Sequence, residues 1–326
     1  MKELVQNFST QLREAKSIAD KALVAPGKNI QNIVISGLGG SGIGGSIVSE
    51  LISDSCSVPV CINKDYHLPA FVSATTLLII SSYSGNTEET LSAMEQGMAK
   101  QAQIVCISSG GKVLELAKQH QFDFIEIPGG FPPRSCIGYS LVQLLKVMVN
   151  KGFAKASLFS DLDKAIQLLD KESASIKKEA MEIAGALKGK IPVIYSLGSS
   201  EGVVVRFRQQ INENSKMLCW HHTFPEMNHN ELVGWTEKND SLVVLTFHTS
   251  FDYKRTLKRY EVCKPIFQKF SSGVIDITAK GESKLEQFLY LIHIGDWISC
   301  YIADLKGIDP VEVNVINHLK SELSKF

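Results

Sequence analysis

The sequence predicts an α/β protein made of two doubly wound domains, each a mainly parallel sheet flanked by helices. Short apolar runs rich in β-branched residues alternate with longer helical patterns along the 326 residues. Strands separated by helices of about 10 to 15 residues are typical of parallel βαβ units, whose sheets carry helices on both faces. The two halves of the chain also resemble each other, so we expect two copies of one fold.

The predicted strands follow this alternation from end to end. They lie near 31–36, 58–62, 76–81, 103–107 and 124–127 in the first half, and near 192–196, 217–221, 242–247 and 273–277 in the second. The expected helices include 87–100, 135–150 and 282–305, and the segment 155–190 predicts helices that bridge the two sheets. These patterns predict a first domain of residues 1–153 and a second of residues 154–326.

Three pairs of segments carry the likeness between the halves. IVISGLGGSG, from Ile33, aligns with VIYSLGSSEG, from Val193. LLIISSYSGN and IVCISSGG, later in the first half, align with LVVLTFHTSF and VIDITAKG in the second. Each match is weak alone, but three in the same order favour a duplication. Only the first copy keeps glycine- and serine-rich turns, so we expect one anion site per chain.

Composition excludes several functional classes. Lys plus Arg and Asp plus Glu both total 34, which gives no electrostatic reason to expect nucleic acid or a membrane surface as a partner. No apolar run reaches the roughly 18 residues of a membrane span, and the charged N-terminus does not resemble a signal peptide. Seven cysteines without a CxxC pair fit reduced thiols. We therefore expect a cytoplasmic protein.

The first glycine-rich turn is SGLGGSGIGGS, residues 36–46, which follows an apolar strand. Glycines leave backbone N–H groups unshielded, and the N-terminus of the following helix favours an anion. The GxGxxG spacing also allows NAD, with Asp65 as the acid that would bind the ribose.

A second turn, SSYSGNTEET at 81–90, also joins an apolar strand to a helix. It offers the hydroxyls of Ser82, Ser84 and Thr87, which exceed what capping one helix requires. A dinucleotide fold has no use for a second serine loop here. The two turns together predict a phosphate site formed by Gly40, Ser41 and these three hydroxyl residues.

These motifs resemble the sugar isomerase (SIS) domain. Two such domains in tandem, with FPPR, QINENSK, PEMNHNELVGW and LKGIDPVEV in the same order, resemble the bifunctional phosphoglucose/phosphomannose isomerases over essentially the whole chain. The resemblance implies an aldose–ketose isomerase that interconverts glucose 6-phosphate, and also mannose 6-phosphate, with fructose 6-phosphate through an enediolate. It also implies a homodimer that needs no metal or organic cofactor.

Such a reaction needs a group that opens the sugar ring, a base and a cation. The resemblance implies that Glu213 is the base, although most helical glutamates are solvated. It assigns ring opening to His229, which is expected to serve the neighbouring subunit's site, with help from Lys306. From the residues alone, Lys306 equally suits a lysine that interacts with the dipole at a helix C-terminus.

Two further roles follow from the resemblance. Arg134 is expected to stabilise the enediolate, and Ser299 stands where a threonine that governs mannose use is expected. His221, His222 and Glu226 near His229 allow a metal site to be considered, but their order lacks a known helical ligand pair such as HExxH, so we expect no metal.

Two alternatives remain open from the sequence. A non-catalytic SIS-domain sensor of sugar phosphates would need the phosphate loops but not Arg134, Glu213, His229 and Lys306. Another SIS isomerase, one that acts on amino sugars, is the second alternative.

Overall fold

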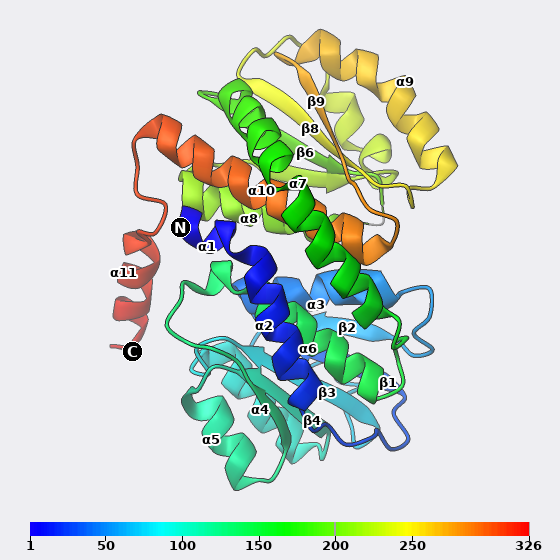
Figure 1. Cartoon of the computed structure of the whole chain (residues 1–326), viewed down its shortest axis with the longest axis vertical. Coiled ribbons are helices and arrows are strands. Elements are labelled where there is room, and N and C mark those ends of the chain that lie inside the picture. Colours follow the sequence, from blue (N-terminus) through cyan, green and yellow to red (C-terminus); the bar gives the residue numbers. More distant parts are fainter. Residues whose placement is uncertain (199, 326) are drawn as a thin grey trace.

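A computed structural model describes residues 1–198 and 200–325, and its described strands form two fully parallel sheets (Figure 1). The first has the strand order β2-β1-β3-β4-β5 and the second β7-β6-β8-β9. In each sheet the first strand of the half lies between the second and third, as in doubly wound folds. This shared order confirms the duplication and the predicted fold class.

The first sheet and its helices occupy the first half of the chain. After α1 (Lys2–Gln6) and α2 (Phe8–Lys21) come β1 (Asn32–Ser36), α3 (Gly39–Ile52), β2 (Val60–Asn63), β3 (Thr76–Ser82), α4 (Glu88–Ala99), β4 (Gln103–Ser108), α5 (Gly111–Gln119), β5 (Asp123–Glu126), the 3₁₀ turn η1 (Pro133–Ser135) and α6 (Ile137–Asn150).

The second half follows the same plan with an extended C-terminus. Its elements are α7 (Leu158–Leu187), β6 (Ile191–Ser196), α8 (Glu201–Ser215), β7 (Trp220–Thr223), the 3₁₀ turns η2 (Glu226–His229) and η3 (Glu231–Gly234), β8 (Leu242–His248), α9 (Lys254–Phe270), β9 (Val274–Thr278), α10 (Lys284–Lys306) and α11 (Asn314–Leu323).

Every predicted strand is present, with two differences nearby. The strand expected at 217–221 begins at Trp220, because Lys216 adopts a left-handed conformation at the end of α8 and the side chain of Asn212 holds the carbonyl of Met217. The helices expected over 155–190 are a single α7 of 30 residues. The predicted boundary at 153/154 falls between α6 and α7 and stays a prediction.

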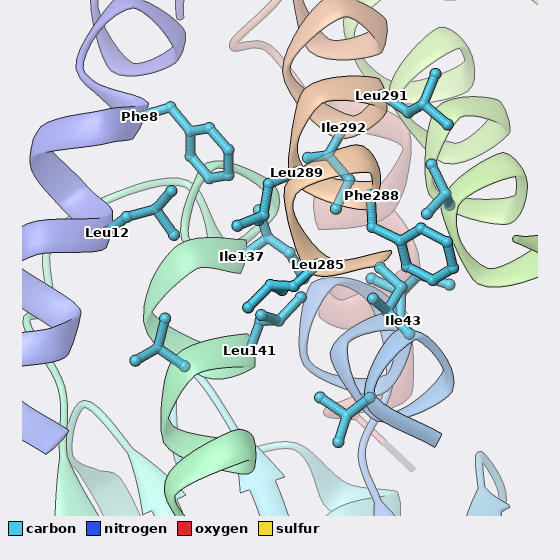
Figure 2. Close-up of a cluster of buried hydrophobic side chains, with 14 of the residues drawn as sticks. Phe8, Leu12, Ile43, Ile137, Leu141, Leu285, Phe288, Leu289, Leu291 and Ile292 are labelled. Carbon is cyan, nitrogen blue, oxygen red and sulfur yellow. The ribbon is translucent and has the colours of Figure 1, made fainter. Parts of the chain in front are cut away.

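A helical layer between the two sheets forms the main hydrophobic core (Figures 1 and 2). Figure 2 shows Phe8 and Leu12 of α2 facing Ile137 and Leu141 of α6, with Leu289 of α10 beside them. Burying each such side chain contributes about 1.5–3 kcal/mol. Separate clusters lie on the outer faces, under α4 and α5 in the first half and under α9 in the second. The shared inner layer fixes one half against the other.

Helix α10 is long and apolar enough, by length and composition alone, to cross a membrane, which the sequence prediction of no such run did not anticipate. However, 83% of its apolar window is buried inside the protein. It packs against α7 and α8, as Figure 1 shows, so it is a core helix.

Candidate active site

The two predicted phosphate loops meet at the carboxyl ends of β1 and β3, which are paired neighbours. The first loop leads into α3 and carries Gly40 and Ser41, and the second leads into α4. The backbone N–H of Tyr83 donates to Oγ of Ser41 over 3.0 Å. The structure therefore joins the two loops directly.

The hydroxyls of the second loop bond to one another and to the loop backbone. Ser82 donates to Oγ1 of Thr87 over 3.1 Å, and the N–H of Asn86 donates to Oγ of Ser84 over 3.3 Å. Thr87 stands at the N-cap of α4, but its side chain makes no capping bond. Within the described residues, no acceptor takes the hydroxyl hydrogens of Ser41, Ser84 and Thr87, so they can donate to a phosphate.

The glycine at position 40 lets the first loop contact η1. A Cβ built on Gly40 would lie 2.9 Å from the carbonyl oxygen of Pro133 and 3.5 Å from Cα of Arg134. Only glycine permits this approach without a shift of backbone. The start of α3 therefore lies against the backbone that carries Arg134.

The Arg134 side chain is 5% exposed and spans from the first half to the second. Its Nη1 lies 3.5 Å from Oε2 of Glu213, and its Nε donates to Oδ1 of Asn214 over 2.8 Å. Its Nη2 donates to the carbonyls of Pro310 and Val311 over 2.6 and 3.1 Å. Burial lowers the pKa of Arg134 and the charge of Glu213 raises it, but a guanidinium stays protonated in proteins.

Glu213 lies in the last turn of α8 with its side chain 30% exposed. It is thus neither a fully solvated surface residue nor sealed in the core. The C-terminal end of this helix is closed by Lys216, whose Nζ donates over 2.6 Å both to the carbonyl of Glu213 and to that of Glu312. Burial lowers the pKa of Lys216. The carboxylate therefore stands at an ordered helix end that faces Arg134.

Lys306 reaches the same helix end. Its Nζ donates to the carbonyls of Ser215 and Lys216 over 2.7 and 3.1 Å. The lysine therefore interacts with the C-terminus of α8, whereas its own helix α10 is ended by Gly307 in a left-handed conformation. Lys306 is exposed, and its two acceptors lie two and three residues after Glu213 in the chain.

Ser299 is fully buried. Its Oγ accepts from Nδ2 of Asn214 over 2.9 Å and donates to the carbonyl of Asp296 over 2.7 Å. The hydroxyl therefore stands behind Asn214, which separates it from Arg134.

His229 is exposed in η2, beyond β7. No hydrogen bond or ion pair between described residues connects it to Glu213, Arg134 or Lys306. The structure of one chain thus brings together three of the four predicted catalytic residues. Likewise, the described residues contain no group of three His, Cys, Asp or Glu side chains arranged to hold a metal ion.

In the second half, the start of α8 corresponds to the predicted phosphate loop of the first half, and it receives the carboxyl group of Glu50. Oε1 of Glu50, on α3, accepts the backbone N–H of Gly202 in the first turn of α8 over 2.7 Å. Burial raises the pKa of Glu50 to about 8. Near neutral pH the group therefore keeps its proton, and it fills the start of α8 as a neutral acid.

Sequence reasoning missed Asn214, Lys216 and Glu50 as parts of this arrangement. Asn214 and Lys216 lie within three residues of Glu213 in QINENSK, so their proximity to the predicted base was the available signal. Glu50 had none, because its partner is 152 residues away.

Comparisons with known proteins show the family to which the chain is similar. Residues 176–323 match the family described as bacterial phospho-glucose isomerase C-terminal SIS domain. The chain is 38% identical to the bifunctional phosphoglucose/phosphomannose isomerase of Caldicellulosiruptor bescii, covering 100% of this chain and 99% of that protein. It is 39% identical to the protein of the same name from Aquifex aeolicus, covering 90% and 91% of the two chains.

A solved structure shares the fold at low sequence identity. Tagatose-6-phosphate ketose/aldose isomerase from Escherichia coli superposes with a TM-score of 0.73 at 13% identity, covering 94% of this chain and 93% of that one. At this identity the likeness concerns the fold alone.

Proposed function

The chain belongs to the family of bifunctional phosphoglucose/phosphomannose isomerases, and we propose that it interconverts glucose 6-phosphate, and also mannose 6-phosphate, with fructose 6-phosphate. The observation that carries the proposal is the position of Arg134. Its backbone contacts the phosphate loop at Gly40, while its side chain lies 3.5 Å from the carboxylate of Glu213. Arg134 thus links the predicted binding site for the substrate's phosphate group to the predicted base.

The proposed reaction begins with phosphate binding at Gly40, Ser41, Ser82, Ser84 and Thr87. His229, assisted by Lys306, moves the proton that opens the sugar ring. Glu213 then takes the proton from C2 of the aldose and returns it to C1, while the hydroxyl proton at C2 transfers to the oxygen at C1. Arg134 stabilises the negative charge that develops on the enediolate oxygens. No electrons leave the substrate, so the step requires no redox cofactor.

Mannose 6-phosphate requires proton abstraction from the other configuration at C2. Ser299 stands at the place of the family's threonine, and we propose that it influences the use of mannose 6-phosphate. Its burial behind Asn214 favours an indirect influence over a contact with sugar.

A homodimer in which His229 enters the neighbouring subunit's site is part of the proposal. It is supported by the exposure of His229 and by α11, on which no described residue is buried. Val315 and Leu319 of α11 are 84% and 58% exposed. Figure 1 shows this helix beside the body of the molecule, where a second copy can cover it. The seven cysteines carry free thiols, which fits the cytoplasmic location that we propose.

The test is substrate profiling of the purified protein in ordinary and heavy water. Glucose and mannose 6-phosphates are each expected to yield fructose 6-phosphate, with solvent deuterium entering the product because an enediolate exchanges its proton. Glucosamine 6-phosphate serves as the amino-sugar control. Binding without turnover would instead support the sensor, and turnover of glucosamine 6-phosphate alone would support the amino-sugar isomerase.

A further inference from the structure

The guanidinium of Arg134 belongs to a closed ring of buried hydrogen bonds. Its Nε donates to Oδ1 of Asn214, and Nδ2 of Asn214 donates to Oγ of Ser299. Ser299 donates to the carbonyl of Asp296, whose carboxylate accepts from Nη2 of Arg206 over 2.7 Å. The same Nη2 donates to the carbonyl of Arg134 over 3.1 Å, which completes the ring.

The ring determines which way the amide of Asn214 points. Because the hydroxyl hydrogen of Ser299 is directed at the carbonyl of Asp296, its oxygen can only accept from Asn214. Asn214 must therefore present Nδ2 to Ser299 and Oδ1 to Arg134. Both Asn214 and Ser299 are fully buried, so water does not compete for these bonds.

The other two nitrogens of the Arg134 guanidinium also have defined partners. Nη2 is taken by the carbonyls of Pro310 and Val311, in the connection between α10 and α11. Since Nε is taken by Asn214, only Nη1 faces Glu213. The plane of the guanidinium is thus set by contacts on two sides, and one edge is directed at the base.

We propose that Asn214 is a positioning residue for Arg134, and that Ser299 acts on the reaction through Asn214 without touching the sugar. This inference rests on the proposed function, in which Arg134 stabilises the enediolate. Stabilisation of that kind depends on donors placed in advance, and a misplacement near 1 Å costs about 100-fold in rate.

The test compares Asn214→Ala with Asn212→Ala, a control on the same helix whose amide bonds to the carbonyl of Met217 and not to Arg134. Asn214→Ala is expected to lower kcat roughly 10- to 100-fold while KM changes less than about threefold, because the phosphate loops are untouched. Asn212→Ala is expected to keep kcat within about twofold. A kcat for Asn214→Ala within about twofold of the wild type would overturn the proposal.

A double-mutant cycle separates positioning from general structural damage. If Asn214 acts through Arg134, Asn214→Ala adds little further loss of kcat to Arg134→Lys. If instead the losses of kcat in the two single variants multiply in the double variant, the two residues act independently and the inference is overturned. Should Asn214→Ala fail to fold, Ser299→Ala replaces it in the cycle with Arg134→Lys, and a smaller loss of kcat is expected. Ser299→Thr, which keeps a hydroxyl, is expected to restore the kcat that Ser299→Ala loses. A wild-type protein without isomerase activity would overturn both proposals, whereas an active wild type with an unaffected variant overturns this one alone.

Discussion

Nη1 of Arg134 and Oε2 of Glu213 lie 3.5 Å apart, although the two residues are 79 positions apart in the chain and belong to different halves. The contact places a permanent cation beside a carboxylate that is 30% exposed. In the proposed reaction the carboxylate of Glu213 loses its charge when it accepts a proton, and the guanidinium of Arg134 then faces an enediolate oxygen. Net charge in the site is conserved during such a step, which avoids a large electrostatic cost in a partly buried place.

Replacing Glu213 by Gln is expected to lower kcat by about 10²- to 10⁴-fold with little change in substrate affinity, because an amide cannot accept the C2 proton. Coupled assays and isothermal titration with glucose 6-phosphate measure the two quantities. Glu201→Gln, at the opposite end of α8, is the control and is expected to keep its activity. Retained turnover in Glu213→Gln would remove this residue from the role of base.

Replacing Thr87 by Ala is expected to raise the KM for sugar phosphates about tenfold and to leave kcat nearly unchanged, because a hydrogen bond to a charged phosphate is made equally in ground and transition states. Steady-state kinetics check the split. Ser92→Ala, whose hydroxyl bonds to the carbonyl of Tyr66, is the control on the same helix. A fall in kcat at constant KM would contradict phosphate binding by Thr87.

Mixing two inactive variants tests whether each site takes His229 from the neighbouring subunit. Co-expressed Glu213→Gln and His229→Ala chains are expected to regain roughly a quarter of wild-type activity, because half the dimers are mixed and each mixed dimer has one complete site. The two variants expressed separately are the controls. Absence of recovery in dimers shown to be mixed would place His229 in the site of its own chain.

Glu50→Gln is expected to flatten the dependence of stability on pH. Burial raises the pKa of Glu50 from 4.5 to about 8, so the folded state binds the proton more tightly than the unfolded state. Stability from this group is therefore fully present below about pH 4.5 and is lost as the pH rises through about 8. Melting temperatures between about pH 5 and pH 9 measure the effect. Glu95→Gln, at an exposed position, is the control. If Glu50→Gln has the same dependence of melting temperature on pH as the wild type, the raised pKa of Glu50 is contradicted.

Prolonged treatment with EDTA is expected to leave isomerase activity intact, because the proposed proton transfer by Glu213, with Arg134 as the cation, needs no Lewis acid. Activity is measured before and after gel filtration. A loss that added zinc restores would instead favour a metal site at His221, His222, Glu226 and His229.

The local elements were predictable because their signals are local. Strand composition, helix periodicity and turn residues each depend on neighbours within a few positions, so the nine strands in the described residues were all expected. The predicted phosphate loops belong to the same class, since both the glycines and the hydroxyls lie within short segments that follow strands. Even the duplication could be read from three short alignments.

The shape of the site was not predictable from the same signals. The motifs that resemble the family pointed to Arg134, Glu213 and Lys306, but not to the ring through Asn214 and Ser299 or to the carbonyls of Pro310 and Val311. Those partners are 80 to 177 residues from the residues that they hold.

The sequence by itself therefore determined the two parallel sheets, the two glycine- and serine-rich loops after β1 and β3, and the residue types available for proton transfer. Only the tertiary structure decided that the carboxyl group of Glu50 occupies the start of α8 and that Asn214 orients Arg134. The physical reason is that both depend on the inner helical layer, where α3, α8 and α10 pack together and bring distant polar groups within hydrogen-bonding distance.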